Sequence, residues 1–485
     1  MKKTTLILIA LVAGLQVAKA EISLPQIIGD GMVLQQNTDA RIWGKATPGA
    51  IIEISSDWSS TVWSAQTGED GRWILSIATP EGSMTPRTIT ITEKMPKGRK
   101  AAETVSSVTL DNILVGEVWL CSGQSNMEMP LDGFWDCPVE GSAEEIALSG
   151  NLKGVRMATV PKTGATVPAE EVQGRWQACS PETSGRFSAA GYYFAKTLNS
   201  VLNVPVGIIS CSWGGSMLEG WLPVETVSSY PDIDHKLTEP ADGNWDAHTP
   251  SVMYNGMLYP LRNYTIRGFA WYQGESNVGR HSTYASRLAD MVGLWREMWG
   301  QGELPFYIVE IAPYIYGGDG TAAARLREAQ QKAAEEIPAS GIVTTNDLVY
   351  SHEDTQIHPC QKEEVGQRLA YLALNRTYGF SGIVCEGPVL RSMEIKGNEA
   401  YLYFDNDESG FSPWYDIKGF EIAAEDKVFH EAEAKVIPGK KCVVVSSQYV
   451  QNPAAVRYCF KDFCPGNLTG SRNLPAFPFR TDSWD

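Results

Sequence analysis

The chain has 485 residues, of which 43% are hydrophobic and 20% charged, a composition typical of a globular protein with about two or three domains and unlike a disordered or collagen-like chain. Its formal net charge of −17 argues against nucleic acid as a partner, because phosphates are bound by clustered Lys and Arg. The sequence has no zinc-type Cys and His spacing, phosphate-binding loop or dinucleotide fingerprint, so we expect no metal and no organic cofactor.

Residues 1–20 form a segment of their own, predicted to be a signal peptide. Lys2 and Lys3 precede the apolar run Thr5–Leu15, and Ala18-Lys19-Ala20 fits a small-x-small cleavage site. The apolar run is too short to span a bilayer, and no run of sufficient length follows it. We expect export to the periplasm or the outside of a bacterial cell. The alternative is a retained membrane anchor.

Nine cysteines follow the leader. An oxidising compartment would permit disulfides, but their pairing does not follow from spacing. Cys121 and Cys211 lie in strand-like runs and are expected to be small buried hydrophobes. The sequence leaves the oligomeric state open.

Residues 21–110 are predicted to be an all-β module. Short strand candidates such as "ARIWGKA", "IIEISS" and "RWILSIA" are separated by the turn signals Pro48-Gly49 and Asp70-Gly71. This spacing is typical of a β-sandwich.

Residues 111–385 are predicted to be an α/β domain. Apolar strand candidates alternate with helical patterns, which favours a mostly parallel sheet with helices on both faces. The expected strands are 113–121, 154–160, 204–211, 266–273, 305–312 and 340–345, and the expected helices are 187–201, 282–299, 321–336 and 361–377. Residues 386–485 return to short strands, so we expect a second all-β module there.

The run "GEVWLCSGQSNMEMP" carries an apolar strand into a small polar turn that contains Ser125. Reactive groups in parallel α/β sheets gather at the carboxyl ends of the strands. Gly123 permits a sharp turn, and a backbone N–H of Ser125 or Asn126 could face an oxyanion, as a serine nucleophile requires. Taken alone, such a serine is more often a turn residue or a helix N-cap.

Three other loops at strand ends complete the expected site. His358, in "TQIHPCQ", is the best base among the six histidines, although a single loop histidine is usually a solvated surface residue. Gly214-Gly215 can offer backbone N–H groups, and Gln273 or Asn277 could add a side-chain amide. Each glycine turn could equally be an ordinary connection between a strand and a helix.

The strings "LCSGQSNMEMP", "SWGGS", "EGWLP", "MYNGMLYPL", "GFAWYQGESN" and "IHP" with "EVGQRLA" resemble the sialate O-acetylesterase family, part of the SGNH or GDSL-like hydrolases. The start "LPQIIGDGMVLQQ" and the end "NLPAFPFRTD" are also similar to that family. The resemblance covers nearly all of the chain after the leader. It implies an SGNH-hydrolase-like fold and hydrolysis of O-acetyl esters on sugars.

Carried over by position, the resemblance makes Ser125 the nucleophile and His358 the general base. Gly215 and Gln273 match the oxyanion-hole loops beside the N–H of Ser125, and Asn277 is a rival donor. Many SGNH hydrolases have an acid three residues before the histidine, where this chain has Thr355. Asp354 could orient His358 instead, or a backbone carbonyl could do so in a Ser-His dyad.

An unperturbed histidine would give a rate that falls below about pH 6–7, since the base must be neutral. The implied substrate is O-acetylated sialic acid. Acetylated xylan or another plant polysaccharide is the alternative substrate, and a non-catalytic glycan-binding protein is the alternative class. Two loop segments with aromatic residues, "DGFWD" (132–136) and "GNWD" (243–246), could stack on sugar rings or could simply pack within the protein.

Overall fold

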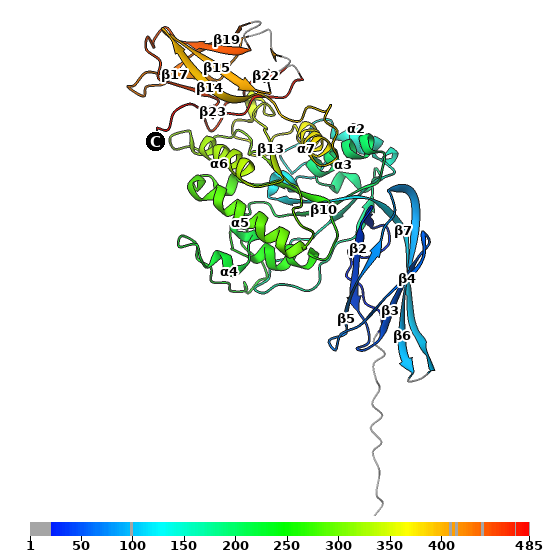
Figure 1. The fold of residues 1–485 in the computed structure, drawn as a ribbon. Helices are drawn as coiled ribbons and strands as arrows, with labels where there is room; N and C mark the ends of the chain where they lie inside the picture. The colour runs from blue at the N-terminus through cyan, green and yellow to red at the C-terminus, as the bar shows by residue number, and fades with distance from the viewer. Residues whose placement is uncertain are drawn as a thin grey trace, which may run out of the picture.

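The computed structural model describes residues 21–97, 100–406, 410–412, 416–437, 441–470 and 472–484, and the predicted leader at residues 1–20 lies outside these ranges. Figure 1 shows three parts in a row: a β module in blue, a central α/β part, and a second β module in orange. Within the described ranges, no helix combines the length and the hydropathy needed to cross a membrane.

The centre of the protein is a mostly parallel sheet with the strand order β13-β12-β11-β7-β10-β8-β9. Every strand predicted for residues 111–385 is present, and the short β9 joins the edge in antiparallel direction. The carboxyl ends of the parallel strands therefore meet at one edge. The strands of this path are β7 (Lys100–Gly123), β8 (Val155–Thr159), β9 (Trp176–Ala178), β10 (Val206–Ser212), β11 (Gly268–Tyr272), β12 (Phe306–Val309) and β13 (Ser340–Val343).

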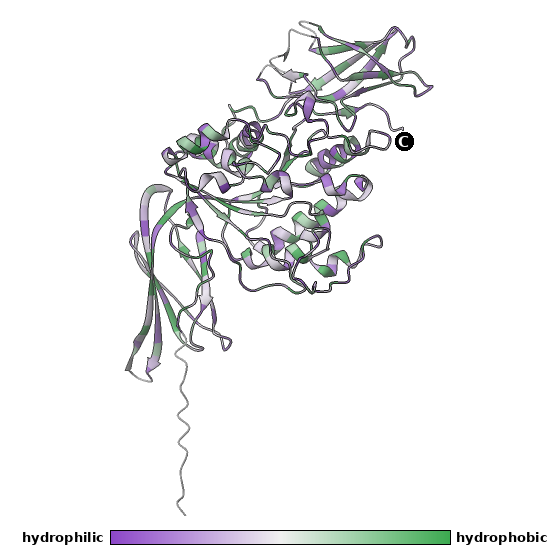
Figure 2. Cartoon of the chain, turned by 180° about the vertical axis from the view of Figure 1, so that it is seen from behind, coloured by the Kyte–Doolittle hydropathy of each residue, from purple (hydrophilic) through white to green (hydrophobic). Residues whose placement is uncertain are grey.

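Four long helices cover the two faces of this sheet, as predicted. Helices α3 (Ala189–Leu202) and α7 (Glu363–Arg376) pack on the face that carries Trp119 and Cys121. Helices α5 (His281–Trp299) and α6 (Ala322–Glu336) share the opposite core with Val118 and Leu120. Alternate residues of β7 are thus buried on opposite faces, which explains its unbroken apolar run. Figure 2 shows the helices coloured in alternating hydrophobic and hydrophilic patches, as amphipathic helices require.

Shorter helical segments lie in the connections. They are α1 (Ser125–Glu128), α2 (Ser142–Leu148), α4 (Val224–Val227), η1 (Ser149–Asn151), η2 (Ser184–Arg186), η3 (Leu218–Trp221), η4 (Tyr254–Leu258), η5 (Tyr259–Leu261), η6 (Glu275–Asn277) and η7 (Ser351–Glu353). Several of them follow strands at the carboxyl edge of the sheet, where the candidate site lies.

Strand β7 belongs to two sheets at once. Its first part pairs antiparallel with β6, and its last part, from Glu117 on, pairs in parallel with β10 and β11. The boundary expected near residue 110 therefore falls inside a continuous strand. The other strands of the N-terminal module are β1 (Val33–Gln35), β2 (Asp39–Lys45), β3 (Ile51–Ser56), β4 (Ser59–Gln66), β5 (Arg72–Ala78) and β6 (Ser83–Lys97).

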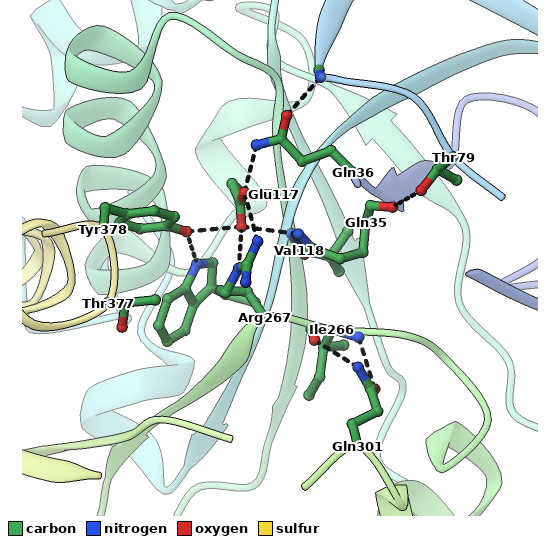
Figure 3. Close-up of polar contacts among 12 residues, drawn as sticks. Gln35, Gln36, Thr79, Glu117, Val118, Ile266, Arg267, Gln301, Thr377 and Tyr378 are labelled. Carbon is green, nitrogen blue, oxygen red and sulfur yellow. Dashed lines mark hydrogen bonds and ion pairs between the residues drawn. The ribbon is translucent and has the colours of Figure 1, made fainter. Parts of the chain in front are cut away.

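A buried carboxylate joins this module to the central sheet (Figure 3). Glu117 is 1% exposed and accepts hydrogen bonds from Gln35, Gln36 and Tyr378. The Nε atom of Arg267 lies 2.8 Å from the Oε2 atom of Glu117. Burial alone would raise the pKa of Glu117, but the hydrogen bonds and charge of Arg267, with help from the two glutamines, outweigh it and lower that pKa. The carboxylate is therefore ionised and fully satisfied.

The C-terminal module is built from strands only, within the residues described after Arg376. Two four-stranded sheets, β14-β15-β20-β19 and β18-β17-β21-β23, enclose their own core. Asp462 docks the module on the central part, since its Oδ1 atom accepts from Ala323 N–H at 2.8 Å. The strands are β14 (Val389–Lys396), β15 (Glu399–Asp405), β16 (Phe411–Ser412), β17 (Phe420–Ala423), β18 (His430–Glu431), β19 (Glu433–Ile437), β20 (Cys442–Ser446), β21 (Ala455–Tyr458), β22 (Thr469–Gly470) and β23 (Phe479–Arg480).

Candidate active site

Ser125 is the first residue of α1, two residues beyond the end of β7. Gly123 has a φ of 138°, and a Cβ atom there would lie 2.1 Å from the carbonyl oxygen of Tyr272. Only glycine fits this approach. The N–H of Gln124 then donates to that same carbonyl at 3.0 Å. The turn therefore fixes Ser125 at the carboxyl edge of the sheet, as the sequence predicts.

The glycine turn after β10 lies against Ser125. A Cβ atom on Gly214 would lie 3.3 Å from the Cβ atom of Ser125. The N–H of Gly214 donates to the Oε2 atom of Glu128 at 2.5 Å, which fixes the turn to α1. Gly215 has a φ of 78°. Within the described ranges, the backbone N–H groups of Ser125 and Gly215 have no hydrogen-bond partner, so both can bind an oxyanion.

A hydrogen bond brings the segment of His358 to the same place. The Nδ2 atom of Asn126, next to Ser125, donates to the carbonyl of Ile357, next to His358, at 2.9 Å. The Nδ1 atom of His358 lies 3.6 Å from the Sγ atom of Cys137. Its Nε2 atom has no hydrogen-bond partner in the part of the chain that the structure describes. The imidazole is thus held on one side and available for proton transfer on the other.

The structure gives Asp354 no contact with His358. The backbone carbonyl of Asp354 accepts from Ile315 N–H at 2.9 Å, and among described residues its carboxylate makes no hydrogen bond with the imidazole. The backbone N–H of His358 donates to Gln356 Oε1 at 3.2 Å, whereas two side chains that contact the imidazole come from a segment more than 200 residues earlier. Besides Cys137, the ring of Phe134 lies edge-on to the imidazole with 5.0 Å between the ring centres.

The side-chain amides of Gln273 and Asn277 lie at the same edge, but they donate hydrogen bonds to other groups of the protein. Gln273 is fully buried, and its Nε2 atom donates to Ser216 O at 3.0 Å and to Asn277 Oδ1 at 2.7 Å. The Nδ2 atom of Asn277 donates to Glu219 at 3.0 Å. These bonds occupy both N–H groups of Gln273, so the expected side-chain donor to an oxyanion has no support in this geometry.

A buried polar network behind Ser125 was not predicted. The Nδ2 atom of Asn126 also donates to Glu275 at 2.5 Å, and the Nζ atom of Lys362 donates to Asn126 Oδ1 at 3.0 Å. Burial raises the pKa of Glu275 and lowers the pKa of Lys362 to about 8. Asn126 and Glu275 lie within the strings "GQSNM" and "QGES", but nothing in the sequence joins Lys362 to them. The network fixes the residues on either side of the candidate Ser-His pair.

None of these residues forms a metal site. Within the described residues, no three His, Cys, Asp or Glu side chains gather where they could hold a metal ion. The groups that the described residues place at the edge are a serine hydroxyl, an imidazole and backbone N–H groups.

The pKa of His358 predicts an acid-tolerant reaction. This pKa is lowered to about 4, mainly by burial and also by the positive charge of Lys362, while Asp136 partly opposes both. The sequence-based expectation of 6–7 assumed an unperturbed group. A general base works when neutral, so kcat/KM should stay level down to about pH 5 and fall about tenfold per pH unit below pH 4. Rates of ester hydrolysis between pH 3.5 and 8, with circular dichroism as the control for folding, check this. A fall that begins near pH 6.5 would contradict it.

The contact with Cys137 predicts which side chain orients the base. Cys137→Ala should lower kcat roughly tenfold, the equivalent of one ordinary hydrogen bond. Cys137→Ser should recover most of that loss, whereas Asp354→Asn should stay within about twofold of wild type. Steady-state kinetics and pH profiles of the three variants distinguish the two assignments. A severe loss in Asp354→Asn together with a normal Cys137→Ala would identify Asp354 as the orienting acid.

Comparisons with known proteins agree on one class. The family model described as "Carbohydrate esterase, sialic acid-specific acetylesterase" matches residues 115–375. The sialate O-acetylesterase of Homo sapiens is 26% identical over 407 residues, which cover 77% of this chain and 75% of that protein. The one from Rattus norvegicus is 26% identical over 453 residues, with 82% and 81% covered. The crystal structure of a carbohydrate acetylesterase from Xanthomonas citri is 31% identical, covers 96% of this chain and 100% of its own, and has a TM-score of 0.83.

Proposed function

Because the chain belongs to the sialic acid-specific acetylesterase family of carbohydrate esterases, we propose that it removes O-acetyl groups from sialic acid through Ser125 and His358. Membership makes the protein a carboxylic ester hydrolase that acts on carbohydrates, and it confirms the resemblance found in the sequence. The choice of sialic acid follows the names of the mammalian relatives.

The observation that carries the proposal is the hydrogen bond between Asn126 Nδ2 and Ile357 O. It joins the residue after the candidate nucleophile to the residue before the candidate base. Together with the contact between Gly214 and Ser125, it supports an arrangement of nucleophile, base and oxyanion donors at one edge. These are the three parts that acyl transfer through a serine requires.

The reaction proceeds in two halves. His358 Nε2 takes the proton of the Ser125 hydroxyl as its oxygen attacks the acetyl carbonyl carbon, and the N–H groups of Ser125 and Gly215 stabilise the resulting oxyanion. The bond to the sugar oxygen breaks as His358 returns the proton to it. A water molecule then gives its proton to His358 and attacks the acetyl-enzyme, and acetate leaves as Ser125 regains the proton.

Acetate release from mono-O-acetylated sialic acid and from partly acetylated xylan tests the proposal. We expect a kcat/KM at least about tenfold higher on the sialic acid, which corresponds to one productive contact with its carboxylate. A preference for xylan would leave a carbohydrate acetylesterase with a plant polysaccharide as its substrate. Binding of either glycan without acetate release would support a non-catalytic protein.

We also propose that residues 1–20 direct export of the enzyme, on the basis of their charged start, apolar run and cleavage signal. Mass spectrometry of protein recovered from a bacterial periplasm should then give Glu21 as the first residue. An intact Met1 in the exported fraction would contradict cleavage.

A further inference from the structure

We propose that Trp135 is a stacking platform for a neutral pyranose ring of the glycan, placed beside the base by the same turn that holds it. The inference rests on the proposed function, because it assigns a binding residue to the site of Ser125 and His358. It concerns the turn of residues 133–137, called the 133–137 turn below.

Trp135 is exposed to an unusual degree. Its side chain is 99% accessible, whereas the next large apolar side chain in order of exposure, Tyr449, is 69% accessible. A whole indole in water gains none of the hydrophobic stabilisation that most tryptophans obtain by burial. A residue placed in this way is suited to cover an apolar surface of a ligand.

The exposure of Trp135 does not come from a loose loop. Phe134 N–H donates to Cys137 O at 2.9 Å, and Cys137 N–H donates back to Phe134 O at 3.2 Å. Gly133 has a φ of 76°, and a Cβ atom there would lie 2.3 Å from Cys137 O. Glycine is therefore required at that position. The 133–137 turn is closed by paired bonds and presents Trp135 at its tip.

The same turn contacts the base on both sides of Trp135. Phe134, one residue before, meets the imidazole of His358 edge-on, and Cys137, two residues after, lies 3.6 Å from its Nδ1 atom. These contacts fix the position of Trp135 relative to His358. We therefore expect a sugar ring stacked on the indole to lie next to the sugar unit that carries the ester.

The chemistry of the turn selects a neutral ring. One face of a pyranose carries C–H groups and packs flat on the negative face of an indole. Asp136 in the turn and Asp132 directly before it are exposed, and both are acidic, so they disfavour the carboxylate of a sugar acid at this position. The stacked unit is thus a neutral sugar next to the acetylated one.

The second aromatic segment found in the sequence behaves differently. Trp245 is partly buried and packs against the main hydrophobic core. A Cβ atom on Gly164 would lie 2.4 Å from its indole ring, so one face of that ring is already covered by the protein. Trp135 is therefore the better candidate of the two for sugar stacking.

Kinetics on two kinds of ester test the assignment. On a partly acetylated xylo-oligosaccharide or an O-acetylated sialyllactose, Trp135→Ala should raise KM roughly tenfold and leave kcat within about twofold. Trp135→Phe should recover part of the loss. Hydrolysis of 4-nitrophenyl acetate, which has no sugar ring, should not change. Tyr449→Ala, on the C-terminal module, is the matched control and should behave as wild type on both esters.

Each outcome decides one question. An unchanged KM on the oligosaccharide in Trp135→Ala would overturn the platform. An equal loss on 4-nitrophenyl acetate would also overturn it, since the variant would then act through His358. If wild type releases no acetate, the proposed function fails, and calorimetry with the deacetylated oligosaccharide judges the platform separately. Equal affinity in wild type and Trp135→Ala would overturn it, and weaker binding by the variant would support it.

Discussion

Ser125→Ala will lower the rate of acetate release by at least about 10⁴-fold, because the proposed acetyl-enzyme forms on the Ser125 hydroxyl. The hydroxyl has no structural partner among the described residues, so the variant should fold normally and still bind the glycan. Acetate release under single-turnover conditions, with calorimetry on the same glycan, measures both effects. The residual rate should reflect the N–H groups of Ser125 and Gly215 alone.

The matched control for this variant is Ser142→Ala. Ser142 begins α2, and its hydroxyl has no hydrogen-bond partner in the described part of the chain. Its removal should leave kcat and KM within about twofold. A Ser125→Ala enzyme that keeps more than a few per cent of the wild-type rate would exclude Ser125 as the nucleophile. The buried network of Asn126, Glu275 and Lys362 would then have a role other than positioning a nucleophile.

Arg267→Met will destabilise the protein by about 2–3 kcal/mol, because it leaves the buried charge of Glu117 without its cation. A fully buried pair would cost more, but the Arg267 side chain is 37% exposed, and Gln35, Gln36 and Tyr378 remain as donors. The apparent melting temperature should fall by roughly 2–5 °C. Arg391→Met is the control, since its pair with Asp405 is exposed on both sides and should contribute less than about 1 kcal/mol.

The pH dependence of that loss identifies its cause. Arg267 helps to lower the pKa of Glu117, so its contribution is present above the unfolded pKa of the carboxyl and is lost as the pH falls through the folded pKa. The deficit of Arg267→Met should be complete from pH 8 down to about pH 5 and shrink below about pH 4.5, since the pKa of Glu117 is lowered from its ordinary value. The double variant Glu117→Gln/Arg267→Met should recover part of the stability. A deficit that is constant with pH and unchanged in the double variant would point to lost packing instead.

The order of elements could be predicted because each central strand and helix has a clear local pattern. The apolar run before Ser125 and the period of α7 both reflect burial that neighbouring residues share. The sequence pattern predicts a domain boundary inside strand β7, because the two halves of the strand have different environments. Residues near Ser107 pair within a half-exposed ribbon, and residues after Glu117 are buried on both faces. A sequence pattern follows the environment and not the continuity of the backbone.

The candidate site could be predicted only in part, for a related reason. Ser125, Gly215 and His358 follow strands of one sheet, so topology alone places them at one edge. The partner of the imidazole depends on tertiary contacts: proximity in sequence suggested Asp354 or a backbone carbonyl, and nothing in the sequence pointed to Cys137. Gln273 has an amide that could donate to an oxyanion, but its Nε2 atom already donates hydrogen bonds to Ser216 O and Asn277 Oδ1. The low pKa of His358 reflects burial, which no motif records.

The continuous strand β7 limits how this protein can be recombined. A fusion or truncation that begins at the central sheet must cut a strand whose two ends are paired with different partners. It also removes Gln35 and Gln36, which donate hydrogen bonds to the buried carboxylate of Glu117. The N-terminal module therefore cannot be removed without cutting β7, and recombination with relatives should succeed only when the module and this strand come from the same parent. The C-terminal module begins after α7, beyond a connecting segment in which the structure has no strand, so a graft of another module should join the chain between residue 377 and residue 388.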